Sequence, residues 1–259
     1  MKIKVLGCSG AELPGFGLPS FLLDDSILID AGTTTAAIGE GAQKKIGHII
    51  ITHSHFDHIR GIPTLADNMF LRDPGHSITL VGTKAVLQVI RKNLLNNIVW
   101  PDFTRKPNLK KPALKLKVIK TGKPFRILDY RITAERTDHT VPAAGYIIEN
   151  SKGKKLLYTG DTGPTDRIWK RADMRSGKTA IDGAIIEVTF PNRMKAAAER
   201  TGHLTPALLL SELKKLRNFP KKLYITHIKP QYITTVTKEL QKLKIKNLKI
   251  LEKDRTYVI

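Results

Sequence analysis

The sequence predicts an α/β protein in which two packed β-sheets carry helices on their outer faces. Three observations support this fold class. Short apolar runs bounded by Gly, Pro or Asp recur along the whole chain, as strands do. Strands dominate the first half, whereas strands and helices are mixed in the second. A chain of 259 residues can bury a substantial core, and we expect one domain over residues 1–259.

The expected strands are short apolar runs separated by turn signals. The run at 48–52 leads directly into a group of histidines. Residues 7–19, between the first two strands, contain repeated Gly and Pro and are expected to form a loop. In chain order the expected strands are residues 3–6, 20–23, 27–29, 48–52, 79–81, 115–120, 131–134, 144–148, 155–158, 183–188 and 223–226.

Helices are expected at 84–93, 205–216 and 236–244. The second has the clearest start signal, because Thr205 can cap a helix and Pro206 suits its first turn. The sequence shows neither a repeat of fixed period nor a low-complexity linker. These elements fit two sheet layers with helices outside them.

The composition favours an anionic partner. Lys and Arg total 44 against 23 Asp and Glu, which gives a net charge of +21. Such a surface attracts nucleotides, nucleic acids or acidic lipid. The single cysteine, Cys8, excludes an intrachain disulfide framework and a Cys-based zinc site. The N-terminal apolar run is too short for a secretory signal and no run is long enough for a membrane helix, so we expect a cytoplasmic protein.

The segment Thr52-His53-Ser54-His55-Phe56-Asp57-His58 is the strongest chemical signal in the chain. It places four metal-capable side chains directly after an apolar strand. Imidazole and carboxylate are the preferred ligands of zinc and similar divalent ions. On a loop, His53 and His55 can point to the same side and hold one ion, while Asp57 and His58 turn toward a second.

Further candidate ligands follow later strands. They are His139, Asp161 in Gly160-Asp161-Thr162-Gly163, and His227. The glycines on either side of Asp161 would let the backbone pass close to an ion. Each of these residues alone is a weak signal. Together with the histidine cluster they give seven side chains, enough for two ions.

The order His-x-His-x-Asp-His, a downstream His, Gly-Asp-Thr-Gly and a late strand-His resembles the metallo-β-lactamase superfamily over nearly the whole chain. The resemblance implies a four-layer αββα sandwich with a dinuclear metal site at one edge of the sheets. It also implies that Asp30, which ends Leu28-Ile29-Asp30, orders the histidine loop. The implied ligands are His53, His55 and His139 for one ion, Asp57, His58 and His227 for the other, and Asp161 as the bridge.

Two later segments resemble the phosphodiesterase branch of that superfamily. Glu187 in Ile186-Glu187-Val188-Thr189, followed by Gly202-His203-Leu204-Thr205, is similar to class II cyclic-nucleotide phosphodiesterases and, more distantly, to tRNase Z. In that branch the histidine stands near the leaving oxygen, which implies that His203 acts there and that Glu187 holds its ring. The stretches 94–103 and 226–230 also resemble the cyclic-nucleotide class, and no long arm insert of the tRNase Z kind is evident.

We therefore expect a metal-dependent phosphodiesterase that hydrolyses 3′,5′-cyclic nucleotides to nucleoside 5′-monophosphates with a metal-bridging hydroxide. His203, Glu187 and Asp57 are the expected catalytic residues. The expected cofactors are two divalent ions, Zn first, with Mn or Fe as alternatives. Competing interpretations are a tRNase Z-like endoribonuclease, which the charge favours, a hydrolase of non-phosphorus esters or amides, and a nucleic-acid-binding protein without activity. An extended sheet edge would also permit a homodimer.

Overall fold

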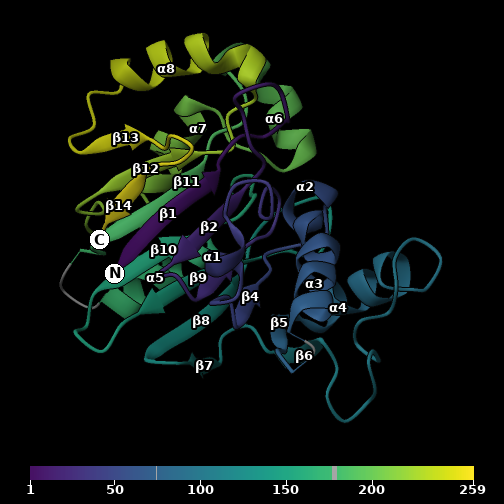
Figure 1. Ribbon diagram of the computed structural model, residues 1–259. Coiled ribbons are helices and arrows are strands. Elements are labelled where there is room, and N and C mark those ends of the chain that lie inside the picture. The colour runs from purple at the N-terminus through teal and green to yellow at the C-terminus, as the bar shows by residue number, and fades with distance from the viewer. Residues whose placement is uncertain (74, 177–179) are drawn as a thin grey trace.

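The computed structural model describes residues 1–73, 75–176 and 180–259 (Figure 1). Its strands form two seven-stranded sheets that lie face to face. The first has the order β14-β1-β2-β3-β4-β5-β6. Its members are β1 (Lys2–Gly7), β2 (Ser20–Leu23), β3 (Ile27–Ile29), β4 (His48–Ile50), β5 (Ile78–Thr83), β6 (Leu114–Ile119) and β14 (Thr256–Val258). Because β14 pairs with β1, the two ends of the chain meet in this sheet.

The second sheet has the order β13-β12-β11-β10-β9-β8-β7. β10, β11, β12 and β13 are mutually parallel, and β9 is antiparallel to both of its neighbours, so β8 runs in the same direction as β10. The carboxyl ends of β8, β10, β11 and β12 therefore reach the same edge. Its members are β7 (Pro124–Ile127), β8 (Tyr130–Arg136), β9 (Ala144–Glu149), β10 (Lys155–Tyr158), β11 (Gly183–Glu187), β12 (Leu223–Thr226) and β13 (Leu248–Ile250).

Helices flank the two sheets (Figure 1). Those on the side of the first sheet are α1 (Glu40–Gln43), α2 (Phe56–Ile59), α3 (Gly61–Arg72) and α4 (Lys84–Val89), the last continued by a π-helical turn at Ile90–Leu94. Those on the side of the second are α5 (Arg167–Ser176), α6 (Lys195–Thr201), α7 (Pro206–Leu213) and α8 (Ile233–Lys242), with short 3-10 turns at Asn192–Met194 and Pro230–Tyr232. None of the helices in these described ranges is both long and apolar enough to cross a bilayer.

Alternation along the strands explains why two sheets form with helices outside. In β2, Phe21 and Leu23 belong to the core between the sheets, whereas Leu22 between them packs toward the helices of the first sheet. In β11, Ile185 faces the inner core, whereas Ala184 packs under the helices of the second sheet. Successive strand side chains point to opposite faces, so a strand that is apolar throughout needs apolar cover on both sides.

The predicted fold class is confirmed, and every predicted strand overlaps an observed one. The four layers also agree with the αββα sandwich that the resemblance implied. The prediction that strands dominate the first half was wrong at α3, where Gly61 and Pro63 resemble breakers. Both lie in its first turn, where Pro is tolerated because the backbone N–H groups lack helical partners.

Asp182 gives this fold a testable acid dependence. Its carboxylate contacts Lys221 Nζ (2.9 Å), Lys154 Nζ (3.1 Å) and the Lys155 amide (3.0 Å). Burial opposes ionisation, but these contacts outweigh it and lower the pKa of Asp182 to about 2. Since the folded pKa lies below the unfolded value of about 4, the stabilisation is complete above pH 4 and disappears as the pH falls toward 2.

We expect Asp182→Asn to lower the free energy of unfolding by about 1 kcal/mol at pH 7. The deficit should shrink at pH 3, because the wild-type carboxylate then begins to lose its advantage over the unfolded chain. Urea unfolding of both proteins at the two pH values measures this. An equal deficit at both would contradict the charge-based explanation.

Candidate metal centre

The predicted ligands follow strand ends that meet at one edge of the two sheets. His53 comes after β4, His139 after β8, Asp161 after β10 and His227 after β12. Ligand sites in α/β proteins commonly form outside the carboxyl ends of strands. The structure brings all seven predicted side chains together in two adjoining groups: His53, His55 and His139 in one, and Asp57, His58, Asp161 and His227 in the other.

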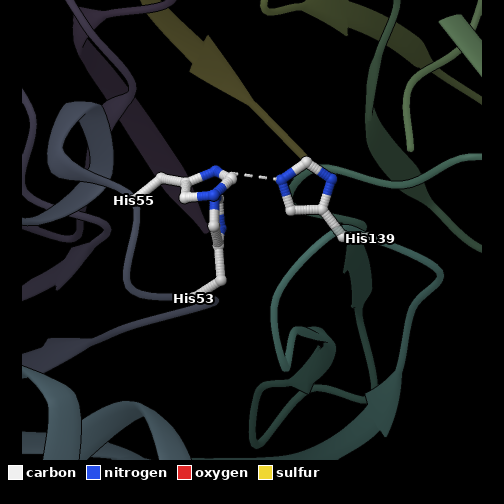
Figure 2. A group of neighbouring side chains, drawn as sticks. All are labelled: His53, His55 and His139. Atoms are coloured by element: carbon white, nitrogen blue, oxygen red, sulfur yellow. Dashed lines mark hydrogen bonds between the residues drawn. The ribbon is translucent and has the colours of Figure 1, made fainter. Parts of the chain in front are cut away.

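The first group consists of three imidazoles from two segments. Figure 2 shows His53 and His55 side by side with His139 facing them. His139 Nε2 lies 3.1 Å from His55 Nδ1, and each pair of rings is 4.8 Å apart between centroids. Three nitrogens at this spacing can share one cation as ligands.

The second group combines two carboxylates with two imidazoles. Asp57 and His58 lie on the single-turn helix α2, not on the loop that the sequence suggested. Asp57 Oδ2 is 3.3 Å from His227 Nε2 and 3.6 Å from His58 Nε2. The helical turn therefore directs the last two residues of the motif toward the second group.

Asp161 belongs to the second group and also lies close to the first. Its Oδ2 atom is 3.2 Å from His227 Nε2 and 3.4 Å from His58 Nε2 in one group. In the other it is 3.7 Å from His53 Nε2 and 4.0 Å from His139 Nε2. A carboxylate oxygen with this set of neighbours is positioned to contact two cations at once. Gly160, just before it, adopts a left-handed φ of 58°, and a Cβ there would clash with Thr52, so its role is close packing.

Hydrogen bonds hold the ring nitrogens that face away from the cluster, which turns Nε2 inward. The acceptors are Thr52 Oγ1 for His53 (3.0 Å), Asp30 for His58 (2.8 Å), the Gly202 carbonyl for His139 (2.9 Å) and Thr189 Oγ1 for His227 (2.8 Å). The Nε2 atoms of His53 and His58 are buried and, among the described residues, have no hydrogen-bond partner. Because such orphaned atoms are rare, the donor set fits a bound divalent ion.

The environment of the cluster shifts the pKa values of its side chains in different directions. Burial lowers the pKa of His53, His55 and His139, which favours their neutral, ligating form. Burial acts in the same direction on His58, but Asp161 and Asp30 outweigh it and raise its pKa. Burial would raise the pKa of Asp161, yet the adjacent His227 and His58 hold it well below its usual value.

Asp30 is fully buried and organises the histidine segment from below. Its carboxylate accepts hydrogen bonds from the Thr52 amide, the Thr52 hydroxyl, His58 Nδ1 and the Tyr158 hydroxyl, each at 2.8 Å. Its left-handed φ of 52° suits Asp better than most residues. Sequence reasoning missed Tyr158, because nothing in the sequence indicates a contact between residues 128 positions apart.

Replacing Asp30 with Ala should lower the free energy of unfolding of the metal-free protein by about 3 kcal/mol, because buried donors would lose their acceptor. Asp30→Asn keeps one acceptor and should cost less. Chemical denaturation after chelation measures both, with Asp129→Ala, at an exposed position, as the control. A change no larger than that of the control would contradict the role given to Asp30.

His203 lies beside the cluster and is held by Glu187. Its Nδ1 is 2.8 Å from Glu187 Oε1, and its ring stacks on that of His227 at 5.3 Å. Burial lowers the tendency of His203 to protonate, but Glu187 outweighs it and raises the pKa of the ring. The Thr189 hydroxyl links His203 to His227, because it lies 3.2 Å from His203 Nδ1 and 2.8 Å from His227 Nδ1. The same hydroxyl donates a hydrogen bond to Glu187 Oε2 at 2.8 Å. Thr189 was missed as well, although it stands only two residues after Glu187.

Comparison with known proteins agrees with this arrangement. The family model described as "Beta-lactamase superfamily domain" matches residues 25–228. A probable 3′,5′-cyclic-nucleotide phosphodiesterase from Yersinia pestis is 28% identical over 73% of this chain and 59% of its own length. A ribonuclease Z from Thermococcus kodakarensis is 32% identical over 70% of this chain and 57% of its own length.

A solved structure supports the same fold. The crystal structure of unliganded yeast PDE1 superimposes with a TM-score of 0.84 at 17% identity and covers 98% of each chain. At that identity the likeness concerns the fold. The matched segment spans less than two thirds of the length of each of these two curated relatives.

Proposed function

Because this chain belongs to the beta-lactamase superfamily, we propose that it is a metal-dependent phosphodiesterase that hydrolyses 3′,5′-cyclic nucleotides to nucleoside 5′-monophosphates. One observation carries the proposal: six donor side chains converge around a seventh, Asp161, with the Glu187–His203 pair directly beside them. The name of the Yersinia pestis relative supports the substrate class.

The ligand assignment follows the two groups. His53, His55 and His139 would hold one divalent ion, Asp57, His58 and His227 would hold the other, and Asp161 would contact both. When bound, such ions polarise a phosphodiester and make a water acidic enough to react at neutral pH. Nitrogen and carboxylate ligands without sulfur suit Zn, Mn or Fe, with Zn as our first choice.

The remaining steps belong to side chains of this protein. The Asp57 carboxylate keeps 29% of its surface exposed, so it can hydrogen-bond to the reacting water and accept its proton. His203, with Nδ1 held by Glu187, can donate the proton on Nε2 to the departing ribose 3′ oxygen. Glu187 also stabilises the positive charge on the ring before the transfer.

A tRNase Z-like ribonuclease is the second candidate, because a net charge of +21 exceeds what a singly charged ligand requires. The relative from Thermococcus kodakarensis also favours it. The observation against it is the resemblance of residues 94–103 and 226–230 to the cyclic-nucleotide class.

One parallel assay tests the proposal. The zinc- or manganese-loaded protein is offered bis-p-nitrophenyl phosphate, cyclic AMP, cyclic GMP and a tRNA precursor. Asp57→Asn serves as the inactive variant and Asp129→Asn as its charge-matched control. Cyclic-nucleotide turnover that disappears only in Asp57→Asn supports the proposal. Cleavage of the tRNA precursor alone would select the ribonuclease, and no cleavage of any phosphodiester would overturn both.

A further inference from the structure

A cavity adjoins the metal centre and is rich in positive charge. Its volume is about 670 Å³, and His139 of the first histidine group forms part of its wall. We call it the basic pocket, after the cations Lys84, Lys120 and Arg136 that line it together with four threonines. Pockets of this size commonly hold small ligands.

The basic pocket lies at the same edge of the sheets as the metal centre. Lys84 follows β5, Lys120 follows β6 and Arg136 ends β8. β5 and β6 are parallel neighbours in the first sheet, whereas β8 belongs to the second. The pocket is therefore formed between the two sheets, and the segment from Arg136 to His139 connects it directly to the centre.

All three cationic residues are exposed. None of them forms an ion pair within the described part of the chain, and no acidic side chain is among the described residues that line the pocket. Glu135, next to Arg136, is engaged by Arg171 Nε at 2.8 Å. Three like charges around one cavity repel each other, so an anion that enters relieves this repulsion.

We propose that the basic pocket binds a second phosphate group of substrates whose scissile phosphodiester lies at the metal centre. This rests on the proposed phosphodiesterase function and extends it. A cyclic mononucleotide has a single phosphate, which the centre itself would hold. The pocket thus assigns to this protein substrates in which one ribose carries two phosphate groups, one on its 3′ and one on its 5′ oxygen, as in a short nucleotide chain. Lys84 and Lys120 supply point charges, and Arg136 can form paired hydrogen bonds with phosphate oxygens.

The test compares ligands that a diesterase does not cleave. Adenosine 5′-monophosphate and adenosine 3′,5′-bisphosphate differ by one phosphate, and adenosine 5′-diphosphate places the added phosphate directly on the first. Calorimetry with the zinc-loaded protein should show the 3′,5′-bisphosphate binding about tenfold more tightly than the monophosphate, and this advantage should fall with salt. Equal binding of the two would overturn the proposal, as would a gain confined to the 5′-diphosphate.

Two triple variants separate the pocket from the general field of the protein. Lys84→Ala/Lys120→Ala/Arg136→Ala should lose the tenfold advantage. Lys238→Ala/Lys242→Ala/Lys246→Ala removes the same charge from exposed positions in and just after α8 and should keep it. An equal loss in both variants would show a general charge effect and overturn the proposal.

Cyclic AMP hydrolysis by the same preparations separates the two proposals. If cyclic AMP hydrolysis is absent but the bisphosphate advantage persists, the proposed cyclic-nucleotide activity fails, and the basic pocket stands as a site for a second phosphate group. If hydrolysis is present and the advantage is absent, the reverse holds.

Discussion

Asp161→Asn is expected to reduce phosphodiester hydrolysis by about three orders of magnitude and to lower the metal content of the protein. The reason is its position: Asp161 Oδ2 lies within 4.0 Å of the Nε2 atoms of His53, His58, His139 and His227. An amide of the same shape removes the negative charge that two neighbouring cations would need. Activity toward bis-p-nitrophenyl phosphate and metal analysis after gel filtration measure both effects.

The control for this experiment is Asp129→Asn, which removes one carboxylate at an exposed position. It should retain activity and metal. If Asp161→Asn kept full activity with a normal metal content, Asp161 would not be the residue that joins the two halves of the centre.

His203→Ala is expected to reduce kcat for cyclic nucleotides by about 10²- to 10³-fold while metal content stays unchanged. The departing ribose alkoxide needs a proton, whereas p-nitrophenolate leaves without one. The loss with bis-p-nitrophenyl phosphate should therefore be much smaller. This difference between two leaving groups distinguishes proton donation from a structural role, and steady-state kinetics with both substrates measures it.

Two variants accompany His203→Ala. Glu187→Gln should show a weaker form of the same leaving-group difference, because it leaves the ring in place without its charged partner. His76→Ala, which removes a histidine whose Nε2 contacts the Ile46 carbonyl, should leave kinetics unchanged. An equal loss with both substrates in His203→Ala would contradict its role as the proton donor.

The sequence predicted most strands of the two sheets because most are short apolar runs, but it missed β7, β13 and β14, whose residues are mostly exposed or half-buried. The side chains of β3, Ile27, Leu28 and Ile29, are all buried, in cores on opposite faces of the first sheet. Helices were harder to predict where the sequence combined helix-forming residues with residues that are typical of loops or exposed surfaces. α5 has many charged residues, and α3 begins with residues that usually end helices. In both cases the sheet beneath supplies the apolar surface that makes the helix stable.

In the candidate metal centre, too, some residues could be predicted from the sequence and others could not. The seven predicted ligands were recognisable because their residue types are uncommon and each follows a strand. The groups that hold them were not. Tyr158 and Thr189 are ordinary residues that act through contacts made only in the folded chain. The basic pocket was also invisible, because Lys84, Lys120 and Arg136 are brought together by strands of two different sheets.

Crystals of the zinc-loaded protein, with diffraction recorded on both sides of the zinc absorption edge, test the central claim most directly. The account predicts two anomalous peaks per chain, one among His53, His55 and His139, and one among Asp57, His58 and His227, with Asp161 between them. Anomalous density confined to other parts of the molecule, or none at all in protein that has not met a chelator, would contradict it.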